Sequence, residues 1–351
     1  MKKAKQQNLI LCLIFYIVFG SMMIIGTFYD LEIDKALFNY TNKFGEFMEY
    51  YGMLPQYCIR LFAYSTLIVC YHPIDKVLKA VQRLLPFSSR FISNKTVHNI
   101  LFILYHIIYG AFFLGAFQGS NELLNFILRS TLGGNLQELY SDTVWGLISW
   151  IILRITLMFI VIFLLSKVKK HKQLLEFMAI VGLALYYGSE IIDILKHHFH
   201  RIRFREMIAY SHGLINENGY TDVAWHILPR KWIDSTDFSA FDRWYKVGCD
   251  MGVYSNATSF PSGHTSAASF SMLIFPLFAK SRSLSKYTAA AFFIGFTYTL
   301  MMGISRLIRG AHYMTDIAAA ALIMFTMMLI FIGILNMIYK KAFDYDECLF
   351  K

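Results

Sequence analysis

The sequence predicts an all-α fold, a polytopic membrane helix bundle with about eight transmembrane helices. Of the 351 residues, 56% are hydrophobic and only 16% are charged, whereas an average soluble domain has about 25% charged residues. Apolar runs of about 20 residues, the length that spans a bilayer core as a helix, recur along the chain between charged segments. Basic residues gather in alternate connections between these runs, a pattern typical of multi-pass membrane proteins.

The apolar runs define eight expected spans. In chain order they are residues 8–29, 54–72, 99–119, 143–166, 174–195, 261–279, 287–304 and 313–339. The first is too long for the apolar part of a signal peptide and no small-residue cleavage site follows it, so we expect it to remain as a signal anchor. A long polar stretch separates the fifth and sixth spans.

The charge distribution predicts the orientation of these spans. If the N-terminus lies inside, the inner segments carry 18 Lys and Arg, whereas the short outer loops 30–53 and 120–142 carry three, with eight acidic residues. We therefore expect a plasma-membrane protein with both termini in the cytoplasm. This topology explains most of the net charge of +10, so no nucleic-acid partner is expected. The absence of organellar signals favours a bacterial membrane.

The connection over 196–260 then lies on the outer face. It holds eight Lys and Arg, seven acidic residues, and Trp225, Trp232 and Trp244. It also contains the turn-rich run 216–219. Two interpretations remain open from sequence, a small folded cap and a mobile loop with aromatic side chains at the membrane interface.

A first polar cluster closes the fifth span. Lys196 and Arg203 are seven residues apart, nearly two helical turns, so both would project from one face if the helix continued outward. Two cations on one face suit an anion. Taken alone the pair is weak evidence, because cations at helix ends commonly extend to the membrane interface.

A second cluster, Pro261-Ser262-Gly263-His264, opens the sixth span. Proline suits the first turn of a helix, serine its cap, and glycine the close approach of a ligand. The backbone N–H groups would then form an anion site with His264 at its rim. An ordinary capped helix start explains this tetrapeptide equally well.

A third cluster combines Ser305 and Arg306 with His312 and Asp316. On a helix, Asp316 would share a face with His312 and accept its Nδ1 proton, which leaves Nε2 free as a nucleophile. An acid just inside a span is costly, which makes it a functional candidate. The three clusters together offer cations, a helix N-terminus, a nucleophile and an acid, the parts that phosphoryl transfer requires.

These residues resemble the type 2 phosphatidic acid phosphatase (PAP2) superfamily, in its integral membrane lipid phosphatase branch. The family signature is Lys-x6-Arg-Pro, then Pro-Ser-Gly-His, then Ser-Arg-x5-His-x3-Asp. All three motifs occur here in order and at this spacing. The one departure is Phe204 in place of proline, which puts the backbone turn after Arg203 in question. Arg205 is either an additional cation or, as we favour, a solvated loop residue.

The resemblance covers roughly residues 99–339 and implies a six-helix core, to which two N-terminal helices are added. The expected domains are 1–98, an N-terminal two-helix addition with an inner loop; 99–339, a PAP2-like catalytic core with an outer cap loop at 197–260; and 340–351, a cytoplasmic tail.

The resemblance also implies roles for the site residues. His312 would attack phosphorus to give a phosphohistidine, Asp316 would orient it, and His264 would protonate the leaving oxygen and then activate water. The implied phosphate-binding groups are Lys196, Arg203, Ser262, Gly263 and Arg306. No metal and no cofactor are expected. A zinc site built from the histidines of the long loop is not favoured, because carboxylate or cysteine partners at metal spacing are lacking; these histidines are His197, His198, His200, His212 and His226.

The function implied is hydrolysis of a lipid phosphate or diphosphate at the outer leaflet, with membrane lipids as the other partners. Undecaprenyl diphosphate, phosphatidate, phosphatidylglycerol phosphate and lipid A are candidate substrates, and the oligomeric state is left open. One alternative is a lipid phosphotransferase that uses the same phosphohistidine. Another is a lipid transporter or inactive lipid-binding scaffold, with Arg154, Glu190 and Asp193 along a path.

Overall fold

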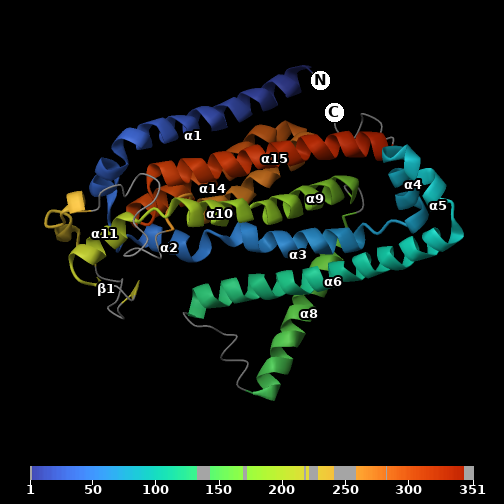
Figure 1. Ribbon diagram of the computed structural model, residues 1–351, viewed down its shortest axis with the longest axis horizontal. Coiled ribbons are helices and arrows are strands. Elements are labelled where there is room, and N and C mark those ends of the chain that lie inside the picture. Colours follow the sequence, from blue (N-terminus) through green and yellow to red (C-terminus); the bar gives the residue numbers. More distant parts are fainter. Residues whose placement is uncertain are drawn as a thin grey trace. The chain divides into compact units, whose positions relative to one another are not determined.

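The computed structural model describes residues 2–132, 143–168, 172–216, 219–220, 228–240, 258–281 and 283–343. These residues are helical apart from turns and one two-stranded antiparallel pair, β1 (Ile215–Asn216) with β2 (Gly219–Tyr220) (Figure 1). The predicted all-α fold class is confirmed.

Most of the described chain lies in α-helices. They are α1 (Lys2–Leu37), α2 (Lys43–Tyr51), α3 (Leu54–Val69), α4 (Ile74–Leu84), α5 (Ser89–Ile92), α6 (Lys95–Leu132), α8 (Val144–Ser166), α9 (Lys172–Gly188), α10 (Glu190–Phe199), α11 (Phe204–Ser211), α12 (Gly263–Ser269), α13 (Ile274–Lys280), α14 (Thr288–Ile308) and α15 (Met314–Phe343). Short 3-10 turns are η1 (Pro86–Ser88), η3 (Arg230–Trp232), η4 (Phe238–Ala240), η5 (Phe270–Leu273) and η6 (Ser285–Tyr287).

All eight predicted spans coincide with helical segments. Among the described residues, six helices are long and apolar enough to cross a membrane, or seven if the bent pair 43–69 and 74–84 counts as one span. The predicted span 54–72 corresponds to α3, which has only 16 residues. The predicted span 261–279 is interrupted by η5 between α12 and α13. The chain is a multi-pass membrane protein.

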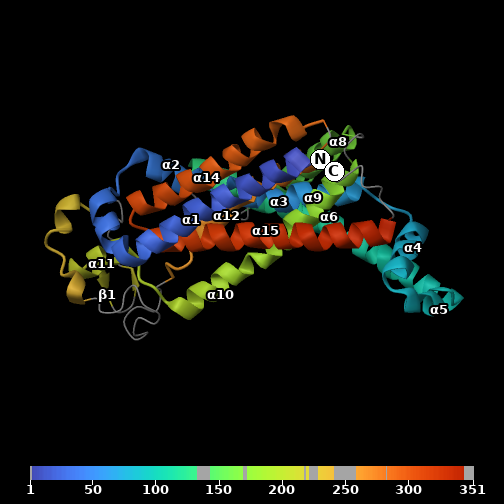
Figure 2. The ribbon, with the colours of Figure 1, turned by 90° about the horizontal axis from the view of Figure 1, so that it is seen from above.

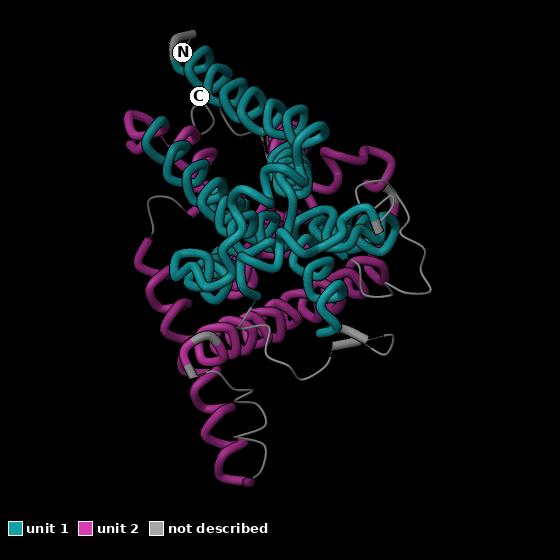
Figure 3. The backbone as a smooth tube through the Cα atoms, turned by 90° about the vertical axis from the view of Figure 1, so that its left-hand side faces the viewer, with its two compact units in different colours: residues 1–55, 188–272, 289–326 teal, residues 56–187, 273–288, 327–351 magenta. Residues whose placement is uncertain are grey.

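The chain divides into two compact units (Figure 3). Unit 1 contains residues 1–55, 188–272 and 289–326, and unit 2 contains residues 56–187, 273–288 and 327–351. The three motifs of the sequence analysis all fall in unit 1, so every residue of the candidate site belongs to one compact body.

In unit 1 the long helix α1 packs beside α14 and α15, as Figures 1 and 2 both show. The fully buried Phe15 of α1 stacks on Phe325 of α15, with ring centroids 4.0 Å apart. It also meets Phe296 of α14 edge to face at 5.9 Å. Aromatic contacts of this kind add to the apolar area that the helices bury, and they fix α1 against the helices that carry the third motif.

The described residues of the long loop pack together with other parts of unit 1. Their side chains join residues of α1 and of the α14–α15 connection in a buried cluster; the buried members are Phe38, Tyr40, Ile202, Phe204, Met207, Ile208, Ala209, Leu228 and Tyr313. Trp232 packs against this cluster. Trp225, Trp244 and His226 lie outside the described residues.

In unit 2, α3, α6 and α8 bury a separate apolar cluster that includes Leu61, Ala116 and Met158. Arg154 of α8 lies with its guanidinium carbon 3.8 Å from the ring centroid of Phe117 in α6. A cation over an aromatic face is a stabilising contact between helices. This contact favours a helix-pairing role for Arg154 over a place on a transport path.

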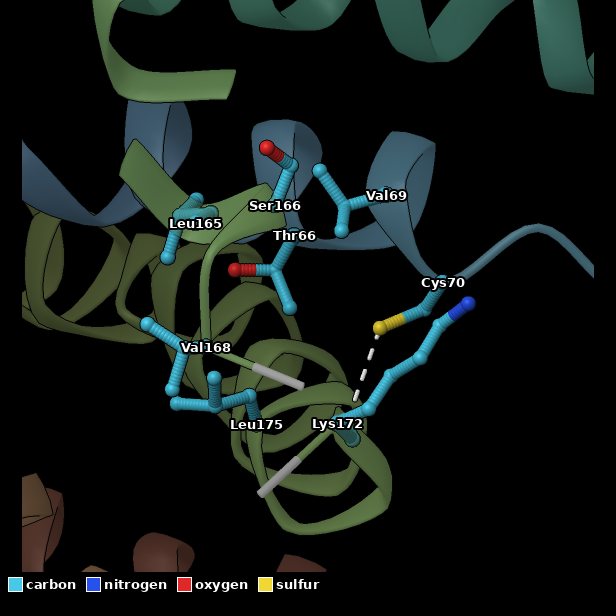
Figure 4. Close-up of a pocket in the computed structure, with 8 residues that line it drawn as sticks. All are labelled: Thr66, Val69, Cys70, Leu165, Ser166, Val168, Lys172 and Leu175. Carbon is cyan, nitrogen blue, oxygen red and sulfur yellow. Dashed lines mark hydrogen bonds between the residues drawn. The ribbon is translucent and has the colours of Figure 1, made fainter. Parts of the chain in front are cut away.

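A cavity of about 410 Å³ lies in unit 2 between the ends of α3, α8 and α9 (Figure 4). Cys70 and Lys172 line it, and the Cys70 thiol donates to the Lys172 carbonyl oxygen at 3.5 Å. None of its lining residues belongs to the three motifs. The three motifs lie in unit 1.

Candidate active site

His312 lies just before α15, and Asp316 lies in the first turn of that helix. The imidazole is 2% exposed. Its Nδ1 is 2.7 Å from the backbone carbonyl oxygen of Ser259 and 3.5 Å from Oδ2 of Asp316. The expectation that Asp316 shares a helical face with His312 and accepts its Nδ1 proton is therefore wrong, because His312 precedes the helix and Ser259 accepts the hydrogen bond.

The Ser259 carbonyl fixes the tautomer of His312. A carbonyl oxygen can only accept, so Nδ1 must carry the hydrogen that it receives. In neutral imidazole the other nitrogen, Nε2, then keeps its lone pair. Sequence reasoning expected this tautomer but assigned the acceptor to a different residue.

Asp316 is fully buried and strongly held. Its Oδ1 accepts from Nη1 of Arg201 at 2.6 Å, and its Oδ2 accepts from the hydroxyl of Ser259. Oδ2 also accepts from the backbone N–H of Tyr313 at 3.0 Å, as the third residue of a helix does in a capping box. The carboxylate thus fixes Ser259, and Ser259 in turn fixes His312.

The second motif lies against the third. Ser262 caps α12 as predicted, and its hydroxyl accepts from the backbone N–H of Thr265 at 3.3 Å. The backbone N–H of Ser262 donates to the carbonyl oxygen of Asp316 at 3.0 Å. The ring centroids of His264 and His312 are 6.5 Å apart.

Gly263 and Lys196 bring the first motif to the same place. A Cβ atom at position 263 would lie 2.6 Å from Nζ of Lys196, closer than two such atoms pack. Glycine therefore admits the ammonium group to the start of α12. Lys196 also pairs with Asp193, at 2.8 Å between Nζ and Oδ1.

Lys196 and Arg203 do not share a helical face, so that expectation is wrong. Helix α10 ends at Phe199, and His200 has a left-handed backbone with φ of 45°. Arg203 then has an extended backbone as the N-cap of α11. A residue in the left-handed conformation ends a helix, and here the cap is histidine, which sequence inspection does not single out.

Phe204 occupies the first position of α11, where the family pattern has proline. It is fully buried and stacks on Phe238 at 5.3 Å between ring centroids. Helix α11 is capped instead by Glu206, whose carboxylate accepts from the backbone N–H of Arg203 at 3.1 Å. The turn after Arg203 is therefore kept by packing and capping.

Arg205 is not a solvated loop residue, which corrects the interpretation favoured from sequence. Its side chain is 12% exposed and lies in α11, with Nη1 3.5 Å from Oε1 of Glu49. Arg306 and Arg309 approach the same carboxylate, at 3.1 Å and 2.9 Å. We call these four residues the arginine cluster: Glu49, Arg205, Arg306 and Arg309.

Arg306 is the most buried member of the arginine cluster, at 1% exposure. Only its Nη2 contacts Glu49; Nε and Nη1 are buried and have no hydrogen-bond partner among the described residues. A guanidinium presents its N–H groups in a fixed fork that matches phosphate geometry. The unpartnered edge of Arg306 is thus suited to bind an oxyanion.

The electrostatic environment of His312 reflects the first and third motifs. Burial lowers the pKa of its imidazole well below the usual 6.5, and nearby positive charges lower this pKa further. These charges belong to Arg203, Arg306 and Lys196. His312 is therefore neutral near pH 7, the form in which Nε2 can attack.

Several residues of this network were missed by sequence reasoning. Ser259 precedes the second motif, Arg201 lies inside the first, and Asp30 and Glu49 come from the N-terminal helices. The acids Asp30 and Glu49 had been counted only as charges of an outer loop. The available signal was the pair of aspartates four residues apart at the end of the first span, Asp30 and Asp34.

The chain was compared with known proteins. No curated protein and no solved structure matches it. The family model of the PAP2 superfamily matches residues 173–340, which include all three motifs. A match to this family in a chain with several apolar helices indicates phosphatase-type activity in a membrane protein. Residues 173–340 of this multi-pass membrane protein are therefore similar to the PAP2 superfamily.

Proposed function

We propose that this protein hydrolyses a lipid phosphate or diphosphate at the outer leaflet of the membrane, through a phosphohistidine intermediate. One observation carries the proposal. The Ser259 hydrogen bond leaves Nε2 of His312 unprotonated, and the positive charge of Arg306, which has two buried nitrogens without a hydrogen-bond partner among the described residues, lowers the pKa of His312. A neutral nucleophile together with a guanidinium that still has N–H groups to donate suits attack on a phosphate ester.

In the first step, Nε2 of His312 attacks phosphorus. The new N–P bond forms as the P–O bond to the lipid breaks, and His264 donates a proton to the leaving oxygen. In the second step, His264 takes a proton from water, whose oxygen attacks the phosphohistidine. The N–P bond breaks and inorganic phosphate leaves, which restores both histidines.

Positive groups stabilise the phosphate during both steps. Arg306 offers Nε and Nη1, and Lys196 and Arg203 add two further charges. The hydroxyl of Ser262 and the backbone N–H of Gly263 would complete the set. Asp316 orients His312 indirectly, through Ser259. Catalysis of phosphoryl transfer consists largely of such positioning and charge stabilisation.

The substrate class follows from the membrane setting. The motif residues lie at the ends of apolar helices, next to spans that cross the bilayer, so the phosphate would be presented by a lipid. The distribution of basic residues among the connections supports an outward orientation for this end of the bundle. Undecaprenyl diphosphate, phosphatidate and phosphatidylglycerol phosphate are the substrates to test.

The test is phosphate release by the purified full-length protein in detergent with EDTA present, for each of the three lipids. We expect release from at least one lipid and an acid-labile, base-stable phosphoprotein after a rapid quench. His312→Ala should abolish both signals. The matched control is His197→Ala, because His197 is an exposed histidine on α10, and this variant should retain wild-type turnover.

Activity of folded His312→Ala above about a tenth of wild type would contradict the assignment, since loss of a nucleophile costs far more than tenfold. A folded wild-type protein that releases no phosphate from any of the lipids would also contradict it. Transfer of the phosphoryl group to an added lipid alcohol, with little free phosphate, would instead indicate the phosphotransferase.

A further inference from the structure

Asp30 lies in α1, far along the chain from the three motifs, yet it reaches the start of α15. It is 5% exposed. Its Oδ1 accepts from the backbone N–H of Thr315 at 3.1 Å, and its Oδ2 accepts from the hydroxyl of the same residue. These bonds hold the helix turn that contains Asp316.

The approach of α1 to this turn depends on a small residue. A Cβ atom at Gly26 would lie 2.9 Å from the Thr315 side chain and 3.0 Å from its backbone nitrogen. Both distances are too short for an unstrained contact. Glycine at position 26 thus allows the two backbones to come close enough for Asp30 to bond Thr315.

Arg201 joins Asp30 to Asp316. Its Nη2 is 2.7 Å from Oδ2 of Asp30, and its Nη1 is 2.6 Å from Oδ1 of Asp316. The guanidinium is 6% exposed and lies over the ring of Tyr313 at 4.0 Å. We call Asp30, Arg201 and Asp316 the carboxylate cluster.

A chain of hydrogen bonds connects the carboxylate cluster to His312. Arg201 holds one oxygen of Asp316, and the other oxygen accepts from the Ser259 hydroxyl. Ser259 holds Nδ1 of His312 through its carbonyl oxygen, and its own backbone N–H donates to the carbonyl oxygen of Arg201 at 2.8 Å. A displacement of Arg201 would therefore move both attachments of Ser259.

A buried carboxylate in a membrane span is costly unless it is paired. One arginine paired with Asp316 alone would balance the charge, so a second aspartate is not needed for neutrality. What Asp30 adds is geometry, since it fixes the second N–H edge of Arg201 and the turn at Thr315.

We propose that Asp30 is a positioning residue for the phosphatase reaction, acting on His312 through Arg201, Asp316 and Ser259. This inference rests on the proposed function. It makes α1, which lies outside the matched segment 173–340, a necessary part of the enzyme.

The experiment compares full-length wild type, Asp30→Asn, Arg201→Gln and the double variant on the lipid that the wild type hydrolyses. Asparagine keeps the shape of Asp30 and removes its charge. We expect kcat to fall about 10- to 100-fold with KM within about twofold, since small displacements of reacting groups cost rate more than binding. Rapid-quench measurement should show slower phosphohistidine formation.

The double variant tests whether the two residues act as one unit. Its kcat should be no lower than that of the more impaired single variant, because residues of one network are non-additive. Asp30→Asn leaves Arg201 paired with Asp316 and so unpairs no buried charge, whereas the double variant removes the counter-charge of Asp316 and is compared only as a folded protein. A folded double variant with wild-type kcat would overturn the proposal.

The matched control is Asp34→Asn, one turn further along α1. Asp34 is fully buried, and its carboxylate oxygens have no hydrogen-bond partner among the described residues. We expect kcat within about twofold of wild type for this variant, because Asp34 makes none of the hydrogen bonds that connect Asp30 to His312. An equal loss in Asp34→Asn and Asp30→Asn would mean that any change in α1 lowers kcat, which contradicts the proposal. Inactivity of the wild type would contradict the proposed function instead.

Discussion

The carboxylate cluster and the arginine cluster flank the same histidine, and they are built in opposite ways. In the carboxylate cluster one arginine lies between two aspartates, at 2.6 Å and 2.7 Å. In the arginine cluster one glutamate faces three arginines at 2.9 to 3.5 Å. The carboxylate cluster thus has two carboxylates for one guanidinium, whereas the arginine cluster has three guanidinium groups for one carboxylate.

This difference in charge suits the two clusters to different roles. The carboxylate cluster would position His312, and the arginine cluster would bind phosphate. Every ionised side chain of the carboxylate cluster has a close counter-charge, so the cluster fixes geometry and adds no site for a ligand. The arginine cluster keeps two buried N–H groups of Arg306 without a partner among the described residues. Buried donors without partners are costly, and an oxyanion at Arg306 would satisfy them.

The sharpest test of the binding side is Arg306→Lys. Lysine keeps the charge but lacks the planar fork, so it cannot offer two parallel N–H groups to one phosphate. We expect kcat to fall about 100- to 1,000-fold, the usual cost of losing a donor to the developing charge. Steady-state phosphate release gives this value.

The control for this substitution is Arg230→Lys. Arg230 is exposed, and it donates to the backbone oxygen of Ala36 at 2.9 Å. Its replacement should leave turnover unchanged. If Arg306→Lys retained more than about a third of the wild-type kcat, charge alone would suffice and the role assigned to the fork would be wrong.

On the positioning side, Asp316→Asn should have the next largest effect. Asparagine can still accept from Ser259 but loses the charge that pairs with Arg201. Because Ser259 keeps Nδ1 of His312 hydrogen-bonded, the tautomer should survive, and we expect kcat to fall about 10- to 100-fold with little change in KM. Asp75→Asn on α4 is an exposed control. A rise in KM of the same size as the fall in kcat would indicate that Asp316 acts on binding.

Glu49→Gln tests whether the glutamate positions Arg306 or competes with phosphate for it. Glutamine can still accept from Nη2 of Arg306, but three arginines then lose their common counter-charge. If Glu49 positions Arg306, kcat should fall about tenfold, a loss comparable to that of other buried charge-assisted bonds. Kinetic constants for one lipid decide between these roles.

The matched control is Glu46→Gln, on the same helix. Glu46 pairs with the exposed Lys43 at 2.8 Å, and such surface pairs contribute little. A lower KM with unchanged kcat in Glu49→Gln would show competition with phosphate and contradict a positioning role.

These two clusters also show what the sequence could predict. The apolar runs predicted the helices, because hydrophobicity is a local property, and the motif spacing selected the residues to which the proposal assigns the chemistry. The spacing of Lys196 and Arg203 gave a wrong prediction of a shared helical face. Helix α10 ends at Phe199, and the next residue, His200, has a left-handed backbone although it is not a glycine.

The residues that form hydrogen bonds with the motif residues could not be predicted from motif spacing or from apolar runs. Asp30 bonds Thr315 across 285 positions, and Glu49 bonds Arg306 across 257. These contacts depend on how α1 and α2 pack in the folded protein. The local pattern of hydrophobic and charged residues does not predict that packing. The only sequence sign was the cost of two acids in one apolar helix.

The smallest predicted effect is a change in pH dependence. Neutral His312 is the attacking form, and burial together with the motif cations lowers its pKa below 6.5. The acid limb of kcat/KM, which reports the free enzyme, should therefore lie below pH 6.5. In Arg203→Gln one positive charge is lost, protonated His312 becomes less unfavourable, and the limb should move to higher pH. Because both proteins use the same lipid, ionisation of the substrate cancels in the comparison. A limb that stayed in place, or moved to lower pH, would mean that the first motif does not act on His312 through its charge.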